Sequence, residues 1–308
     1  MSSGPSVVPV SQAVEGLVDE IARLAGTASV EVNVQDEKLL TGTRQWFPEG
    51  MTMYVSHLPG QTWDATSAMC QAVRRAGYEP VPHVPVRLIT SAESLERILH
   101  MLAVTSRPRG ILLISGDYPE AKGPYSEVAE VLESPALTAH GFTEVAVAGH
   151  PEGHAQVPND RLHASERRKL AIAQADGLQA TIVTQFLFEP EPFIVWANEL
   201  RMRGVTARVA CGLAGPAKIT TLFRYATRCG VGASIRALGA RPSSVKGLLG
   251  DHGPDRMLRG LAEARVTKRC EFTNVHMFCF GGLIRTAEWL ARVADRDFVL
   301  RDSGGFTT

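Results

Sequence analysis

Polar residues at the ends of predicted β-strands are the first candidates for chemistry in this chain. In SVEVNV (29–34), valines alternate with Ser29, Glu31 and Asn33. Alternate residues of a strand face opposite sides, so valines facing outward would point Glu31 into an enclosed interior. Burial there would raise the pKa of the carboxyl group and suit it to general-acid catalysis. The alternative is a solvent-facing glutamate on an ordinary amphipathic strand.

Two further strand ends carry polar groups of a different kind. The segment SGDYPEAKG (115–123) places Gly116 and Asp117 directly after a predicted strand, where a carboxylate typically faces a ligand. A turn-forming aspartate without a functional role explains this sequence equally well. Gln185 ends ATIVTQ (180–185), and its amide could read the edge of a heterocycle or simply cap a loop.

The segment GHPEGH (149–154) resembles the zinc motif H-E-x-x-H only superficially. That motif needs a helix to bring both histidines to one face, whereas Pro151 and Gly153 favour an irregular loop. We therefore expect no metal here and predict a loop that contacts a cofactor. The five cysteines are scattered and form no C-x-x-C pair, which indicates neither a disulfide framework nor a zinc site.

Short β-rich runs alternate with longer helical stretches, a pattern typical of parallel strands joined by helices. The predicted strands are 29–34, 51–56, 79–86, 110–115, 144–149, 180–185, 207–212 and 274–280. The predicted helices include 62–77, 93–104, 166–177 and 191–204, and several are followed by glycine, a common helix stop. Eight such units predict an α/β fold, a (β/α)8 TIM barrel.

We predict a single catalytic domain over residues 1–308. An amphipathic helix should precede the first strand, and extra helices near 215–229 and 255–265 should separate strands seven and eight. A two-domain doubly wound sheet is the structural alternative, but no G-x-G-x-x-G follows the first strand. The final residues, RDSGGFTT, are expected to form a flexible tail.

The charge balance favours a small-molecule substrate. Lys and Arg number 32 and Asp and Glu also number 32, so no net basic field would attract nucleic acid or a membrane surface. The chain has no apolar run near the roughly 20 residues that span a bilayer, and its first residues do not resemble a secretory signal. We expect a cytoplasmic location.

In chain order, SVEVNV, VPHVPVR, LLISGDYPEAKGPYSE, VAGHPEGH, ATIVTQFLFE and VHMFCF resemble the strand ends of the methylenetetrahydrofolate reductase family. The resemblance implies reduction of 5,10-methylenetetrahydrofolate to 5-methyltetrahydrofolate by ping-pong kinetics. It implies FAD as cofactor, NADH or NADPH as hydride donor, and a homo-oligomer.

The same resemblance implies a role for each matched residue. Glu31 would protonate the folate and open its ring, Asp117 would stabilise the resulting cation beside the flavin, and Gln185 would bind the pterin. Arg285 is a further substrate-binding candidate. The residues implied in holding the flavin are His83, Gly116, Asp117, Tyr125, Ser126, His150 and His154.

Several positions depart from the family pattern. Ser115 replaces an arginine, His150 replaces a tyrosine, and the expected lysine is replaced, with Gln174 near its position and Lys169 slightly earlier. HMFCFGG (276–282) lacks the family's Asn-Arg, and Arg285 lies three residues beyond the family arginine. Two alternatives follow: a folate reductase without flavin, or a folate-binding or partner subunit without catalysis.

Overall fold

The structure is a computed structural model that describes residues 10–116, 118–154, 156–228, 251–302 and 304–308. Asp117, predicted to be catalytic, lies outside the described residues.

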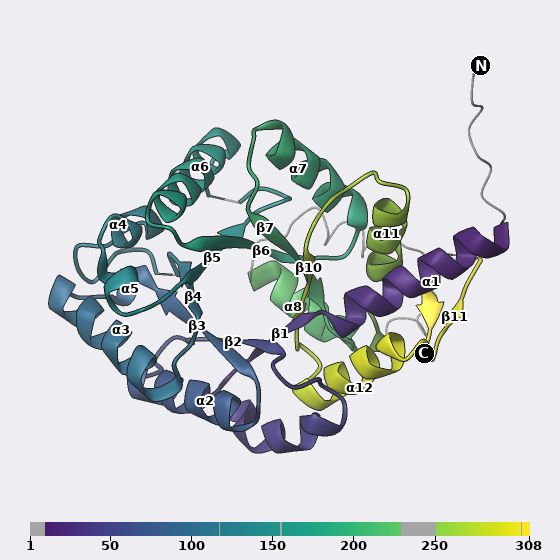
Figure 1. Ribbon diagram of the computed structural model, residues 1–308, viewed down its shortest axis with the longest axis horizontal. Helices are drawn as coiled ribbons and strands as arrows, with labels where there is room; N and C mark the ends of the chain where they lie inside the picture. The colour runs from purple at the N-terminus through teal and green to yellow at the C-terminus, as the bar shows by residue number, and fades with distance from the viewer. Residues whose placement is uncertain (1–9, 117, 155, 229–250, 303) are drawn as a thin grey trace.

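Eight parallel strands close into one barrel, as predicted (Figure 1). Around the barrel the order is β1-β10-β7-β6-β5-β4-β3-β2, so the first and last strands of the barrel are neighbours. The strands are β1 (Ser29–Val32), β2 (Thr52–Val55), β3 (Glu79–Pro85), β4 (Gly110–Ile114), β5 (Glu144–Gly149), β6 (Gln179–Leu187), β7 (Arg208–Ala214) and β10 (Asn274–Phe278). All eight predicted strands are therefore present, in chain order.

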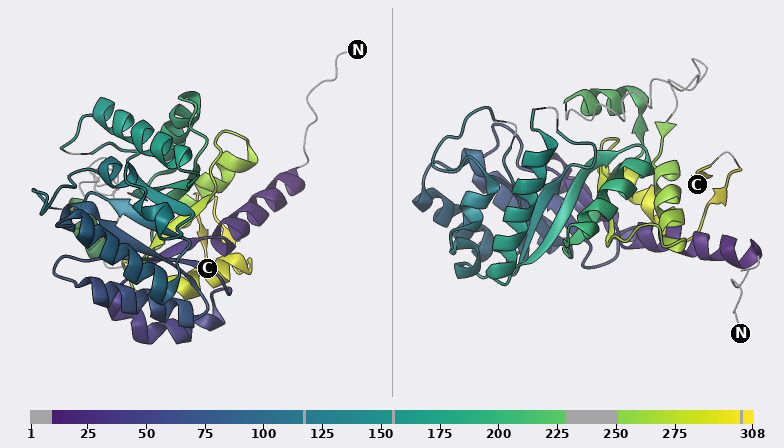
Figure 2. Two further views of the ribbon diagram at one scale, coloured as in Figure 1. Left: turned by 60° about the vertical axis from the view of Figure 1, so that its left-hand side comes forward. Right: turned by 90° about the horizontal axis from the view of Figure 1, so that it is seen from above.

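Helices surround this barrel (Figures 1 and 2). They are α1 (Val10–Gly26), α2 (Trp63–Arg75), α3 (Ala92–Ser106), α4 (Val128–Leu132), α5 (Ala136–Ala139), α6 (Asn159–Ala175), α7 (Pro190–Met202), α8 (Ile219–Arg228), α11 (Asp255–Val266) and α12 (Leu283–Ala294). Two 3-10 helices are η1 (Val34–Gln45) and η2 (Val86–Leu88). Among the described residues, the N-terminal helix α1 and the helices α8 and α11 between the seventh and eighth barrel strands match the prediction.

Local sequence explains where several helices begin and end. Thr62 and Ser91 precede α2 and α3, and each side chain accepts a hydrogen bond from a backbone N–H of the first turn. After α2, Gly77 has a φ of 89°, a left-handed conformation that glycine adopts without a Cβ clash. The glycine stops noted in the sequence thus coincide with real helix ends.

The barrel interior is packed with side chains and is not an open pore. Tyr54, Val81, Leu112, Ala146, Val183 and Ala210 form one buried cluster, contributed by six successive strands of the barrel. Val30 and Val32 belong instead to the large core between the strands and the helices. Strand alternation therefore directs Ser29 and Glu31 inward, as predicted.

The C-terminal residues differ from the prediction of a flexible tail. β12 (Phe306–Thr307) pairs antiparallel with β11 (Val299–Leu300), and Phe306 is 2% exposed. The Phe306 ring stacks against Trp289 of α12 at a centroid distance of 5.8 Å. Because burial of one aromatic ring outweighs the flexibility of Gly304 and Gly305, the prediction is wrong for residues 304–308.

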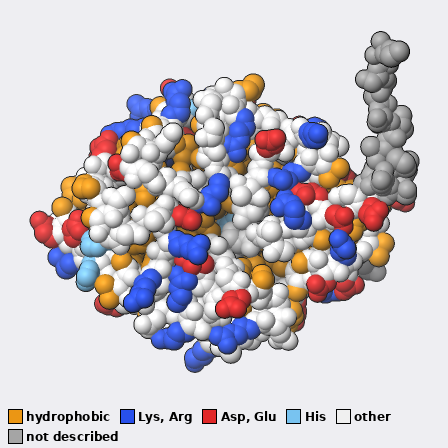
Figure 3. All heavy atoms as spheres, viewed as in Figure 1, with side chains coloured by type: hydrophobic (Ala, Val, Ile, Leu, Met, Phe, Trp, Pro, Cys, Tyr) orange, Lys and Arg blue, Asp and Glu red, His pale blue; other side chains and the backbone are white. Residues whose placement is uncertain are grey.

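A second small sheet pairs β8 (Ala217–Lys218) with β9 (Asp251–His252). On the face shown in Figure 3, acidic and basic side chains are interspersed, in keeping with the balanced composition. None of the described helices has both the length and the apolar character needed to span a bilayer.

Candidate functional site

Glu31 lies in a compact polar cluster at the carboxyl end of β1. Its Oε1 accepts a hydrogen bond of 2.7 Å from the Ser56 hydroxyl. Its Oε2 lies 3.7 Å from Nε2 of His83 and 3.7 Å from Nε2 of His276. These two distances are in the range of ion pairs and are longer than hydrogen bonds. The Glu31 side chain is 24% exposed, so the carboxyl group remains accessible from the barrel mouth.

His276 is the member of this cluster that sequence reasoning missed. It is 1% exposed and comes from β10, which pairs directly with β1. Nδ1 of its ring lies 2.9 Å from the Ser29 hydroxyl, and the Tyr54 ring lies edge-on at 4.8 Å. If Ser29 donates that bond, a neutral His276 carries its proton on Nε2, facing Glu31. The alternation of side chains along β10 could have identified His276, because it places Asn274, His276 and Phe278 on one face of the strand.

The electrostatics of Glu31 correct one prediction. Burial raises the pKa of this carboxyl group, but His83, His276 and the Ser56 hydroxyl together hold it below its usual range. Burial lowers the pKa of His83, and Glu31 only partly opposes that effect. At neutral pH the cluster therefore contains a carboxylate beside a neutral His83. The expectation that burial leaves Glu31 with a raised pKa is wrong, because it considered burial without the partners of the carboxyl group.

His57 follows β2 beside this cluster and was also missed. Its ring stacks on Trp63 with centroids 4.1 Å apart, and its Nδ1 lies 2.7 Å from Thr66 Oγ1. Gln61 donates to the same Thr66 oxygen, and the Thr66 hydroxyl proton can be donated either to His57 Nδ1 or to the Thr62 carbonyl at 3.4 Å. Burial lowers the pKa of His57 to about 4, and His83 contributes to the shift.

This shift predicts a loss of stability in acid. Between pH 6.5 and 4 the unfolded chain binds a proton at His57 that the folded chain does not, so folded stability falls as the pH falls. We expect His57 to account for roughly 3 kcal/mol of that loss. Urea unfolding at several pH values should show a shallower pH dependence in His57→Asn, which keeps a hydrogen-bond acceptor for Thr66. The exposed His100→Asn is the matched control, and equal slopes in wild type and His57→Asn would contradict the assignment.

The segment after β4 carries three of the described flavin-binding candidates. Gly116 has a φ of 86°, and a Cβ there would lie 2.9 Å from the Tyr118 ring. Tyr125 is 9% exposed. The backbone N–H of Ser126 donates to Glu130 Oε2 at 2.6 Å, and the Ser126 hydroxyl contacts the same carboxylate. The polar groups of Ser126 therefore bond the Glu130 carboxylate in the first turn of α4, whose N-cap residue is Glu127.

After β5, His150 and His154 form an edge-to-face pair with centroids 5.6 Å apart. His154 is exposed, and its Nδ1 accepts a hydrogen bond from the Gln156 N–H. Burial and the neighbouring Lys169 lower the pKa of His150 to about 4. Lys169, from α6, is 9% exposed, and burial lowers its pKa. The loop therefore presents a neutral imidazole beside a largely buried amine.

Gln185 lies at an irregularity in β6 that the sequence did not reveal. The strand continues to Leu187, two residues past the predicted end, and its pairing with β7 shifts between Val183 and Phe186. The Thr184 hydroxyl accepts a hydrogen bond from the Gly212 N–H at 2.8 Å. This bulge sets the direction of the half-buried Gln185. Phe186 of β6 pairs with Gly212 of β7, and Gly212 pairs with His276 of β10. Strand β7 therefore lies between Gln185 and β10.

Five aromatic rings form a cap above the polar cluster; we call Phe186, Phe188, Tyr225, Phe278 and Phe280 the aromatic cap. They pack with Leu222 and Ala226 of α8, which extends beyond one end of the barrel in Figure 2 (right). Tyr225 stacks on Phe280 at 4.1 Å, and Phe278 contacts the His276 ring edge-on at 4.8 Å. Partly exposed rings of this kind can stack against a flat conjugated ligand.

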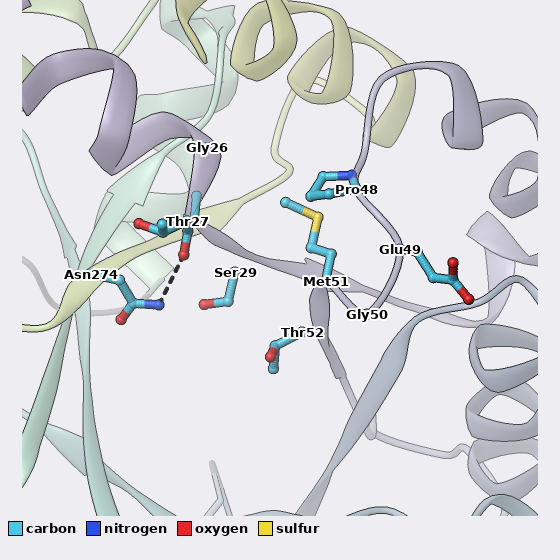
Figure 4. A pocket seen from close by; sticks show the side chains of 10 residues that line it. Gly26, Thr27, Ser29, Pro48, Glu49, Gly50, Met51, Thr52 and Asn274 are labelled. Carbon is cyan, nitrogen blue, oxygen red and sulfur yellow. Dashed lines mark hydrogen bonds between the residues drawn. The ribbon is translucent and has the colours of Figure 1, made fainter. Parts of the chain in front are cut away.

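The remaining predicted residue and one surface hollow lie elsewhere. Arg285 lies in the first turn of α12 and is partly exposed. A hollow of about 240 Å³ opens at the opposite, amino-terminal end of the barrel strands and is lined by Thr27, Ser29, Met51, Thr52 and Asn274 among others (Figure 4). It holds no buried charge, and functional groups of such barrels gather at the other end. Among the described residues, no three histidine, cysteine or acidic side chains are arranged to bind a metal ion.

No family model matches the chain. Three solved structures illustrate its similarity to other proteins. Dihydropteroate synthase from Thermus thermophilus is 11% identical, with a TM-score of 0.47 over 87% of this chain and 91% of that one. A putative phosphonomutase from Burkholderia cenocepacia is 12% identical, with a TM-score of 0.45 over 74% and 99%. A mandelate racemase/muconate lactonizing enzyme from Bordetella bronchiseptica is 8% identical, with a TM-score of 0.43 over 87% and 56%. At these values the similarities carry no functional argument.

Proposed function

We propose that this chain reduces 5,10-methylenetetrahydrofolate to 5-methyltetrahydrofolate with FAD as cofactor and NADH or NADPH as hydride donor. The reaction transfers two electrons and consumes one proton for each folate reduced. The proposal includes ping-pong kinetics, a cytoplasmic location and a homo-oligomeric assembly, all of which the sequence led us to expect.

The observation that supports this function most directly is the position of Glu31. One carboxyl group stands at the carboxyl end of the barrel, partly open to the mouth, with two imidazoles at 3.7 Å and a hydroxyl at 2.7 Å. Reduction of a methylene bridge requires a proton for the nitrogen that leaves the carbon. A carboxyl group that faces the ligand and can carry a proton meets this requirement.

The lowered pKa of Glu31 makes it a carboxylate at neutral pH, so it must gain a proton before it can give one. A ligand that covers the mouth would exclude water and raise the pKa of the carboxyl group. Burial lowers the pKa of His83 and leaves it neutral, so the proton would come from solvent before the ligand closes the mouth. The Nε2 atoms of His83 and His276 would need to approach Glu31 Oε2 by roughly 0.7 Å to form hydrogen bonds that hold the carboxyl group.

The residues around the mouth fit a flavin. His83 Nε2 is buried and has no hydrogen-bond partner among the described residues, so a polar ligand edge could satisfy it. The aromatic cap offers ring faces nearby, because Phe278 contacts the His276 ring. When bound, a flavin would accept hydride from the nicotinamide and return it to the folate carbon. His83, Gly116, Tyr125, Ser126, His150 and His154, together with Asp117, are the proposed holding residues.

In this proposal the other side chains orient the folate. Gln185 would hydrogen-bond the pterin edge through its amide, and Arg285 would contact the more distal part of the substrate. Asp117 would favour the cationic intermediate that forms when the folate ring opens.

The visible spectrum of the purified protein tests the proposal. We expect absorbance bands of oxidised flavin that bleach when NADH or NADPH is added without oxygen and return when methylenetetrahydrofolate follows. Formation of 5-methyltetrahydrofolate in equal amount should accompany the return. A protein reconstituted with FAD and still unable to bleach or to form product would contradict the proposal.

Two other outcomes select the alternatives. A colourless protein that forms 5-methyltetrahydrofolate without added flavin would indicate direct reduction by the nicotinamide. A protein that binds folate but transfers hydride from neither donor would indicate a binding or partner subunit, which the loss of the family's Asn-Arg after β10 motivates.

A further inference from the structure

The loop between β4 and α4, residues 115–127, is bonded near both of its ends by one arginine. The Nη1 group of Arg87 donates to the Tyr118 carbonyl at 2.7 Å, and its Nε donates to the Ser126 carbonyl at 3.0 Å. Tyr118 and Ser126 lie near opposite ends of the loop. One side chain from η2 therefore joins both arms of a loop that contains no described helix or strand.

The backbone of Arg87 adds two further contacts to the same loop. Its carbonyl accepts a hydrogen bond of 2.8 Å from the Lys122 N–H, and its own N–H donates to the Ser115 carbonyl at 3.4 Å. All the loop atoms that bond Arg87 belong to the backbone. The attachment therefore constrains the path of the loop whatever side chains it carries.

Gly123 shows how closely the loop lies on the segment after η2. A Cβ on Gly123 would collide with the carbonyl oxygen of Ile89 and lie 2.5 Å from the Thr90 carbonyl oxygen. Only a residue without a side chain fits there. Beyond it, Glu130 accepts hydrogen bonds from the N–H groups of Ser126 and Glu127, which fixes the start of α4.

We propose that Arg87 is a positioning residue that sets the conformation of the β4–α4 loop and thereby the affinity for the flavin this loop holds. The identity of the ligand rests on the proposed function; the attachment of the loop does not. Arg87 acts through Gly116, Tyr125 and Ser126 and takes no part in the chemical step. A planar guanidinium reaches two carbonyls at fixed angles, which a lysine ammonium cannot reproduce.

Two measurements test the proposal on Arg87→Ala and Arg87→Lys. Cleavage after the exposed Lys122 by a lysine-specific protease should be at least tenfold faster in both variants than in wild type. The Kd for FAD, measured by quenching of flavin fluorescence, should rise at least tenfold. At saturating FAD, kcat should stay within about threefold of wild type, and added ethylguanidine should restore protection and affinity in Arg87→Ala.

Arg97→Ala is the matched control, because Arg97 is an exposed arginine on α3. It should match wild type in both measurements. Wild-type protection and FAD affinity in Arg87→Ala and Arg87→Lys would overturn the proposal. If wild type itself binds no FAD, the flavin assignment fails, while the cleavage rates still decide whether Arg87 positions the loop. Should Arg87→Ala unfold, Arg87→Lys decides both questions.

Discussion

Replacing Glu31 with glutamine should lower the rate of folate reduction by roughly 10³-fold or more, because an amide at this position cannot give a proton to the folate nitrogen. The amide keeps the shape of the side chain and can still accept the Ser56 hydrogen bond. Bleaching of bound flavin by NADH or NADPH should continue at a rate close to that of wild type. Stopped-flow absorbance, with each half-reaction followed separately, measures both rates.

Two comparison variants sharpen this result. Ser56→Ala removes one contact that lowers the pKa of Glu31 but keeps the carboxyl group, so folate reduction should change by no more than about tenfold. Glu15→Gln alters an exposed glutamate on α1 and should change nothing. Full folate turnover by Glu31→Gln would eliminate Glu31 as the proton donor.

Gly212→Ala should lower the free energy of unfolding by about 3 kcal/mol, because an added Cβ would lie 2.5 Å from the carbonyl oxygens of Thr184 and Gln185. Backbone atoms on neighbouring strands of a closed barrel cannot move apart without breaking ladder hydrogen bonds. The Thr184 hydroxyl that accepts from the Gly212 N–H would be displaced as well. Urea unfolding followed by circular dichroism measures the change.

Gly16→Ala is the matched control for this prediction. Gly16 lies within α1 with no heavy atom within 4 Å of an added Cβ, so alanine there should stabilise the chain by up to about 1 kcal/mol. If Gly212→Ala unfolds at the same urea concentration as wild type, the close approach of β6 and β7 is not as described. If it folds stably but binds folate weakly, the bulge positions Gln185 without limiting stability.

The bulge also shows why the sequence could identify Gln185 as a candidate at the end of a strand but could not predict the direction of its side chain. A run of β-branched and apolar residues predicted the strand, and the strand is present. Nothing in ATIVTQ reveals that the register with β7 shifts after Val183. The shift accompanies a hydrogen bond from the Gly212 N–H of β7 to the Thr184 hydroxyl, which the sequence of β6 cannot predict. A pairing irregularity depends on two strands at once, whereas a sequence pattern describes one.

The prediction for the C-terminal residues failed for a related reason. Gly304 and Gly305 were interpreted as flexible, and both indeed adopt positive φ. They form the turn that returns Phe306 to Trp289, a contact that appears only when α12 and the end of the chain are both in place. Local composition predicts flexibility, and long-range burial can reverse it.

By itself, the sequence determined the eight strands, their order, most of the surrounding helices and the inward direction of Glu31. Each of these follows from periodicity along a single segment. Only the tertiary structure decided which groups surround Glu31, since barrel closure places β10 against β1 and brings His276 to a residue almost the whole chain away. The pKa of Glu31 depends on those neighbours as well as on burial. Whether that pKa is raised or lowered could therefore be decided only from the tertiary structure.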